Sequence, residues 1–198
     1  MMQSSFFLQQ HIQNNPTDLL LQLGIAGCFN PSLPLGSTWI VEREYLGSLG
    51  VVENNAELLN NQQQNEQWQD IFDLGLQQQN TPPFQKKALM NPHIPNWPWL
   101  PMDNLGLATG ITVDEISTSP GRIATLKRHY ANAEHPARPI LESMEGASLH
   151  FTALQHQIPF LQLRGISNYT GQRDKSYWNI PLAIKEVTKV AIAVMGML

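Results

Sequence analysis

Strand-like apolar runs alternate with helical segments along most of this chain, and this alternation constrains the fold more than any other feature. Strands are expected at residues 19–26, 36–45, 105–116, 139–144 and 158–166, and helices at residues 1–13, 120–131, 145–157 and from 181 onward. Because such alternation is typical of layers in which helices cover a sheet, the sequence predicts an α/β architecture. The length of 198 residues fits a single domain, here residues 1–198.

Residues 54–102 interrupt this alternation and are interpreted as an irregular excursion within the domain. The first part, 54–79, is rich in Asn and Gln, which favours a solvated segment with a short helix near 68–74. The second part, 81–102, is rich in proline and predicts a long irregular loop. Its Trp97 and Trp99 are candidates for contact with a substrate tail or another subunit.

Composition and charge narrow the classes of function. Apolar residues make up 42% and charged residues 14%, as in a globular protein, and the net charge of −4 argues against nucleic acid as the main partner. The single cysteine, Cys28, excludes an internal disulfide and fits a reducing compartment. The first residues lack the features of a signal peptide, and no apolar run is long enough to cross a membrane. We therefore expect a cytoplasmic protein that binds neither nucleic acid nor a membrane.

Three predicted strand ends carry unusual residues, and in α/β sheets ligands collect beyond the carboxyl ends of strands. The segments are Gly-Ile-Ala-Gly at 24–27, Glu-Ser-Met-Glu-Gly-Ala at 142–147 and Arg-Gly-Ile-Ser-Asn at 164–168. A carboxylate of the second segment can accept hydrogen bonds from the vicinal hydroxyls of a ribose, and the Asn168 amide can meet a heterocycle's ring nitrogen and carbonyl. Each residue alone also has a structural explanation, since acids favour first helical turns and Ser and Asn favour turns.

Together, in order and spacing, the three segments resemble the nucleoside phosphorylase and nucleosidase superfamily. The resemblance covers nearly the whole chain and is greatest to the branch that hydrolyses futalosine, a hypoxanthine nucleoside that carries a benzoate, on a route to menaquinone. It implies a three-layer fold with a mixed central sheet flanked by helices, and a homo-oligomer. The substrate is expected to be a small purine nucleoside. No cofactor or metal is expected, and the six histidines show no metal-ligand spacing.

The resemblance also implies roles for individual residues. Glu145 is expected to bind the ribose hydroxyls, Met144 to pack on the sugar, Glu142 to support the ribose and water side, and Asn168 to stabilise the departing base. The remaining expected substrate contacts are Ser167, Ala26, Gly27, Thr112 and Arg173. For Arg173 two interpretations stand: a forked pair with the benzoate, or a contact that shapes its loop, for example with Asp174.

Two departures from the superfamily pattern bear on the reaction. Asn168 replaces the Asp of adenine-specific relatives, and an amide can donate to a 6-oxopurine without any change of protonation, which favours hypoxanthine as the leaving base. Gln22 and Ile25 stand where phosphorylases place an Arg and a Ser to hold phosphate. Because neither offers a charged partner, water is expected to be the nucleophile.

The chain is also expected to begin inside the fold. We find no match for the family's opening strands or for the acid that activates water, and Glu42 and Glu44 are not expected to replace it because they follow the glycine-rich segment. Two alternatives therefore remain beside a futalosine-type hydrolase. One is a nucleosidase for methylthioadenosine or S-adenosylhomocysteine, and the other is an inactive, truncated remnant that only binds purines.

Overall fold

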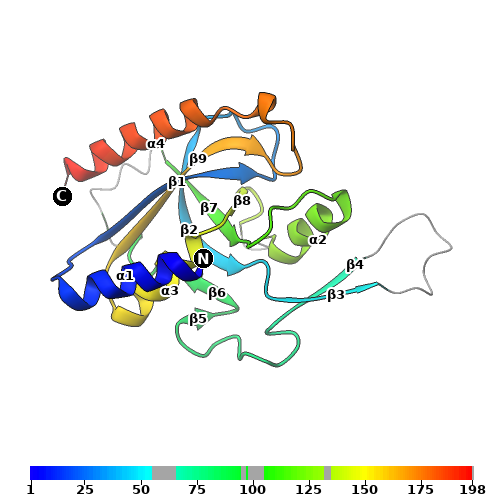
Figure 1. Ribbon diagram of the computed structural model, residues 1–198, viewed down its shortest axis with the longest axis horizontal. Helices are drawn as coiled ribbons and strands as arrows, with labels where there is room; N and C mark the ends of the chain where they lie inside the picture. The colour runs from blue at the N-terminus through cyan, green and yellow to red at the C-terminus, as the bar shows by residue number, and fades with distance from the viewer. Residues whose placement is uncertain (55–65, 95–96, 98–104, 132–134, 198) are drawn as a thin grey trace.

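Helices cover both faces of a mixed sheet in the computed structural model, which describes residues 1–54, 66–94, 97, 105–131 and 135–197 (Figure 1). The strands are β1 (Leu20–Cys28), β2 (Thr38–Leu46), β3 (Gly50–Asn54), β4 (Glu66–Asp70), β5 (Phe84–Gln85), β6 (Ala88–Met90), β7 (Gly106–Thr112), β8 (Ile140–Ser143) and β9 (Phe160–Tyr169). The helices are α1 (Met2–Asn14), α2 (Pro120–Tyr130), α3 (Gly146–His156) and α4 (Ile180–Met195). The predicted α/β class is confirmed.

The main sheet closes on itself. Its strand order is β5-β6-β2-β7-β8-β1-β9, and β2 also pairs with β9. Strands β2, β7, β8, β1 and β9 therefore form a closed ring, from which β6 and β5 extend as an edge. Parallel pairs join β1 to β9 and β7 to both β2 and β8, whereas β1–β8 and β2–β9 are antiparallel. The ring brings the ends of β1, β8 and β9 together.

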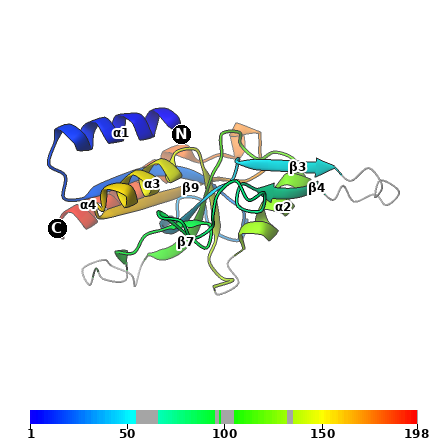
Figure 2. The same cartoon turned by 90° about the horizontal axis from the view of Figure 1, so that it is seen from below.

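Helix α4 packs on one side of this ring, against β9, β1 and β2, and α3 packs on the opposite side, with α1 lying beside α3 (Figures 1 and 2). The buried stripe of α4, which includes Val187 and Val194, contacts Leu161 and Leu163 of β9. Asn179 caps α4 by accepting the N–H of Leu182. These contacts produce the three layers that the sequence predicts, with β9 held between two helices.

The predicted short helix at 68–74 is wrong. Residues up to Asp70 form β4, which pairs with β3 in a ribbon beside α2. The Oδ1 atom of Asp70 accepts the N–H groups of Phe72 and Asp73, at 2.9 and 2.8 Å, and so caps a turn. Trp68 is 8% exposed and packs as a strand residue. The apolar spacing here comes from a strand followed by a turn, which a helical pattern imitates.

The proline-rich segment 81–102 is more regular than expected, because it contains β5 and β6. Leu89 of β6 is fully buried and packs with Phe84 and Ala147. Trp97 packs against the core cluster below α4. Trp99 lies outside the described residues, so the expectation for it stays a prediction.

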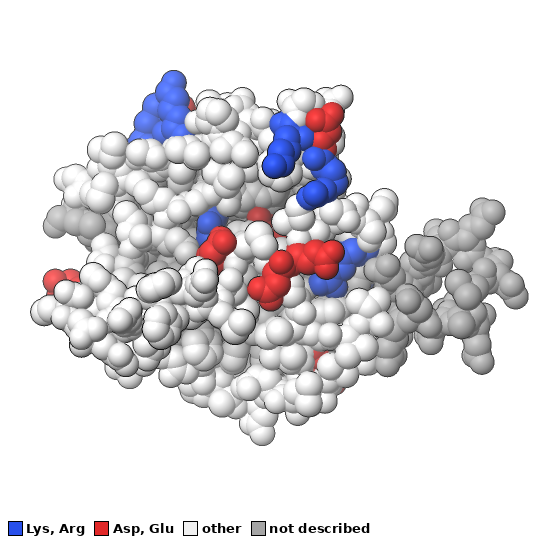
Figure 3. All heavy atoms as spheres, viewed as in Figure 1, with Lys and Arg blue, Asp and Glu red and all other residues white. Residues whose placement is uncertain are grey.

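Within the described ranges, no helix combines the length and apolar character needed to span a bilayer. On the face shown in Figure 3, acidic and basic side chains lie near one another rather than in separate patches. With only 14% charged residues, most of this face is uncharged.

Candidate active site

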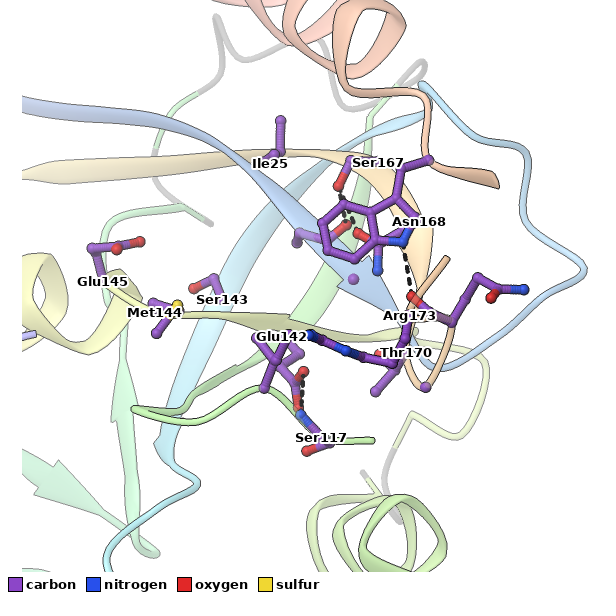
Figure 4. Close-up of a pocket in the computed structure, with 16 residues that line it drawn as sticks. Ile25, Ser117, Glu142, Ser143, Met144, Glu145, Ser167, Asn168, Thr170 and Arg173 are labelled. Carbon is purple, nitrogen blue, oxygen red and sulfur yellow. Dashed lines mark hydrogen bonds between the residues drawn. The ribbon is translucent and has the colours of Figure 1, made fainter. Parts of the chain in front are cut away.

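A cavity of about 210 Å³ opens where β1, β8 and β9 end (Figure 4). Its wall contains the ends of those strands, the loop after β7 and the loop after β9. The lining residues are Ile25, Ala26, Gly27, Ile116, Ser117, Glu142, Ser143, Met144, Glu145, Ser167, Asn168, Thr170, Gly171, Gln172, Arg173 and Trp178. Pockets that enclose a drug-sized ligand are roughly 300–1,000 Å³, so this one suits a smaller group or part of a longer molecule.

A β-bulge shapes the cavity where β1 meets β9. The register passes from Ala26 paired with Ile166 to Gly27 paired with Asn168, which leaves Ser167 as the extra residue. The Ser167 hydroxyl lies 2.8 Å from Asn168 Oδ1 and 3.3 Å from the carbonyl oxygen of Ala26. A hydroxyl has one hydrogen to donate, so Ser167 donates to the nearer acceptor, Asn168 Oδ1. Ser167 thus fixes the Asn168 amide with its oxygen occupied. The Asn168 NH2 group donates one hydrogen to the carbonyl oxygen of Tyr169 at 3.3 Å and keeps the other for a ligand.

Glu145 stands at the other end of the cavity, as the N-cap residue of α3 (Figure 4). Its side chain is exposed, and Met144 beside it is 39% exposed. The Gln22 side chain connects Glu145 to β9. Gln22 Nε2 lies 3.4 Å from the Glu145 carbonyl oxygen, and Gln22 Oε1 accepts a hydrogen bond from Arg164 at 2.9 Å. A carboxylate placed at a helix N-terminus and open to the cavity can accept hydroxyl donors from a ligand.

Glu142 provides a second carboxylate between these ends. It is 7% exposed, and burial raises its pKa, opposed by the Ser117 hydrogen bonds and by the nearby positive charge of Arg122. Its Oε1 accepts the main-chain N–H of Ser117 at 3.1 Å. Among the described residues, the buried Oε2 of Glu142 has no hydrogen-bond donor. Buried polar atoms without protein partners are uncommon, and one in a cavity wall is available to a ligand or to water.

Arg173 lies at the rim, at the end opposite Glu145 (Figure 4). The Asp174 carboxylate accepts the N–H of Ser176 at 2.9 Å and caps a 3₁₀ turn. Within the described part of the chain, no ion pair of Arg173 is present. Trp178 stands nearby, with its indole N–H donating to the carbonyl oxygen of Gln172 at 2.8 Å.

Thr112 is the one predicted substrate contact that does not line this cavity. Its side chain is turned inward, beneath the first turn of α3. The Thr112 hydroxyl donates to Glu44 Oε1 at 2.9 Å, and its oxygen accepts the N–H of Ala147 at 2.7 Å. Thr112 therefore holds the start of α3 in place, and the substrate contact expected for it is corrected to this structural role.

The other predicted residues meet at the cavity, and their roles stay predictions. They are Asn168, Glu145, Glu142, Met144, Ser167, Ala26, Gly27 and Arg173. Sequence reasoning missed Ile116 and Ser117, which follow β7, and Thr170 and Trp178, which follow β9. The polar loop after β9 was visible in the sequence as a break in the apolar pattern. The loop after β7 shows no such break in the sequence. Its place beside β8 follows from the pairing of the strands, which the sequence does not reveal.

A group of possible metal ligands lies outside the cavity, at Asp70, Asp73 and His129. The Lys87 ammonium lies 3.2 Å from Asp70 Oδ2 and also contacts Asp73. His129 Nε2 lies 2.9 Å from the same Asp70 oxygen. These carboxylates are therefore already paired with a cation, which explains the grouping without a metal ion.

Comparisons with known proteins agree with this geometry. No family model matches the chain. The futalosine hydrolase of Streptomyces coelicolor is 25% identical over 181 residues, which is 89% of this chain and 65% of that protein. The futalosine hydrolase of Thermus thermophilus is 27% identical over 187 residues, 92% of this chain and 71% of that protein. The chain thus spans about two thirds of the length of these curated relatives.

Solved structures show the same fold. The native futalosine hydrolase of Helicobacter pylori matches with a TM-score of 0.64 at 14% identity, covering 98% of this chain and 73% of that one. The methylthioadenosine/S-adenosylhomocysteine nucleosidase of Neisseria meningitidis, in complex with methylthio-immucillin-A, matches with a TM-score of 0.70 at 15% identity, covering 98% and 76%. The corresponding enzyme of Streptococcus pneumoniae, with 8-aminoadenine, also has a TM-score of 0.70, at 17% identity, and covers 98% and 76%.

Proposed function

We propose that this chain, a homologue of futalosine hydrolases with the nucleosidase fold, hydrolyses the N-ribosidic bond of futalosine to hypoxanthine and dehypoxanthine futalosine. The supporting observation is that one cavity holds Glu145 toward one end and the oriented amide of Asn168 toward the other. A nucleoside needs acceptors for its ribose hydroxyls and donors for its base, and the two ends of the cavity offer these in turn. The curated relatives named futalosine hydrolase support this substrate over methylthioadenosine.

The proposed reaction proceeds through an oxocarbenium-like sugar, so the protein has to hold the ribose and stabilise the departing base. Glu145 accepts hydrogen bonds from the 2′- and 3′-hydroxyls. Its negative charge then lies near the sugar ring as positive charge develops on that ring. Asn168, whose oxygen is occupied by the Ser167 hydroxyl, donates its NH2 group toward N7 or O6 of the purine. Met144, exposed beside Glu145, packs on the sugar.

Water rather than phosphate is the proposed nucleophile. The Gln22 side chain is held by Arg164 and by the carbonyl of Glu145, and Ile25 presents an apolar side chain to the cavity. Phosphate would therefore lack the charged, hydrogen-bonded partners that make such anions bind tightly.

One assay tests the function. The purified chain is incubated with futalosine, inosine or methylthioadenosine, with and without phosphate, and the products are separated by chromatography. We expect hypoxanthine from futalosine at a rate that phosphate leaves unchanged, and no ribose 1-phosphate product. Faster cleavage of methylthioadenosine than of futalosine would establish the alternative nucleosidase, and hypoxanthine binding without turnover would establish an inactive purine-binding remnant.

Two proposals stand for Arg173: a forked pair with the benzoate of futalosine, or a contact that shapes the loop after β9. One variant separates them, and the benzoate pair predicts the following result. Replacing Arg173 with Ala is expected to raise KM for futalosine about tenfold, because a forked, charge-assisted pair at a partly solvated rim contributes roughly 1.5 kcal/mol. KM for inosine, which has no carboxylate, should change less than twofold. An equal loss for both nucleosides would assign Arg173 to the shape of its loop instead.

The remaining proposals concern the setting of this activity. The reaction would belong to menaquinone biosynthesis, and the buried free thiol of Cys28 is in keeping with a reducing, cytoplasmic compartment.

A homo-oligomer is proposed on the resemblance to nucleosidases, and exposed apolar side chains such as Phe6, Phe7 and Ile192 offer surface for it. Sedimentation of the purified chain measures this directly, and a monomer at micromolar concentration would exclude it.

A further inference from the structure

Gly27 lies between Glu142 and Asn168 on three adjacent strands. It is in register with Glu142 on β8 and with Asn168 on β9. Residues in register on neighbouring strands project to the same face, and both side chains line the one cavity. Since strands lie about 4.8 Å apart, the Cα atoms of Glu142 and Asn168 are roughly 10 Å apart. The cavity therefore has a floor with a carboxylate on one side and an amide on the other.

The floor is open because Gly27 has no side chain. A Cβ atom there would lie 3.3 Å from Asn168 Nδ2 and 3.2 Å from Thr170 Oγ1, closer than most side-chain contacts. The Thr170 hydroxyl, like Glu142 Oε2, is buried and has no hydrogen-bond partner among the described residues. Polar atoms left without partners around a glycine floor are what a flat, polar ligand would contact.

Beside the Ser117 hydroxyl, which can donate or accept, Glu142 presents a free carboxylate oxygen to the cavity. Glu142 Oε1 accepts the main-chain N–H of Ser117, and Oε2 has no hydrogen-bond partner among the described residues (Figure 4). The ionised carboxylate has further lone pairs and no hydrogen of its own to give. A ligand atom that approaches here is therefore favoured if it carries a hydrogen, and disfavoured if it carries a lone pair.

The edges of purine bases differ in this respect. A 6-oxopurine such as hypoxanthine has an N1–H donor next to the O6 acceptor, whereas adenine has the N1 acceptor next to an amine donor. We infer that Glu142 is a specificity-determining residue that accepts the N1–H of a 6-oxopurine while the Asn168 amide donates to O6 or N7. This inference rests on the proposed function, and it assigns Glu142 to the base instead of the ribose side.

Binding of the free bases to the full chain, measured by titration calorimetry, tests the assignment. Replacing Glu142 with Gln is expected to lower the affinity for hypoxanthine at least tenfold, because a neutral amide is a weaker acceptor than a carboxylate. Adenine should bind as well as before or better, since the new NH2 group can donate to its N1. The control is Glu115→Gln, an exposed acid in the same loop as Ser117 but outside the cavity lining, for which both affinities should stay within twofold.

A second measurement needs no variant. In 1-methylhypoxanthine a methyl group replaces the N1 hydrogen, and we expect the unaltered chain to bind it at least tenfold more weakly than hypoxanthine. Equal binding of these two ligands, or an equal loss of hypoxanthine and adenine in Glu142→Gln, would overturn the assignment. If the unaltered chain binds neither base and releases none from futalosine, the proposed function itself fails. If the unaltered chain binds hypoxanthine and releases it from futalosine, but Glu142→Gln keeps the same preference for hypoxanthine over adenine, only the role of Glu142 fails.

Discussion

Replacing Glu145 with Gln is expected to lower kcat/KM for futalosine about 100- to 1,000-fold while the chain stays folded. The proposed role gives Glu145 two charge-assisted hydrogen bonds from ribose hydroxyls, and each such bond contributes roughly 1.5–3 kcal/mol. The Gln side chain has the same shape but loses the charge and one acceptor. A loss of about 3–4 kcal/mol corresponds to the expected fall in rate.

The measurement is the release of hypoxanthine by variant and parent at the same pH, with Glu115→Gln as the matched control. Stability in urea should change by about 0.5 kcal/mol or less, because the Glu145 side chain is exposed and the N-cap of α3 forms no side-chain capping bond. With 2′,3′-dideoxyinosine, which lacks both hydroxyls, the variant should differ little from the parent. A variant that keeps most of its activity on futalosine would remove Glu145 from the site.

The site was predictable where its residues lie close together in the sequence. The segments 24–27, 142–147 and 164–168 each end a strand, and their apolar patterns and glycine or polar endings are visible locally. The structure brings all three to one cavity because β1 pairs with both β8 and β9. Ser117 and Thr170 were missed for the opposite reason, since they reach the cavity only through the path of loops that carry no periodic pattern.

Thr112 and Glu44 could not be placed from the sequence because their positions depend on pairing. The register of β2 against β7 shifts between Val41 and Arg43, so one extra residue disrupts the alternation of side chains. A strict alternation therefore does not reveal which face Glu44 occupies. The structure buries Glu44 completely under the first turn of α3, against Gly110 and Gly146.

Stability of the parent chain is expected to depend on pH through Glu44. Burial raises the pKa of Glu44 to about 7 from 4.5, although the positive charge of Arg164 and hydrogen bonds from Thr112 and Gln162 oppose this rise. The folded chain thus holds this proton more tightly than the unfolded chain does. The contribution of this proton to the free energy of unfolding is fully present below about pH 4.5 and is lost as the pH rises to about 7.

His150, also completely buried nearby, acts in the opposite direction. Burial lowers its pKa to about 4 from 6.5, chiefly because desolvation disfavours the charged ring. Its contribution is present above about pH 6.5 and is lost as the pH falls toward 4. Over the range that the two groups share, their effects on the free energy of unfolding largely cancel.

Replacing Glu44 with Gln removes one of these opposing effects and leaves the other. A shift of about 2.5 pKa units corresponds to about 3 kcal/mol. On acidification from pH 7 to pH 4.5, the Glu44→Gln chain should therefore lose about 3 kcal/mol more free energy of unfolding than the parent. Urea denaturation at both pH values measures the difference, with Glu115→Gln expected to follow the parent. Parallel behaviour of Glu44→Gln and parent would mean that Glu44 is ionised throughout this range, paired with Arg164 inside the fold.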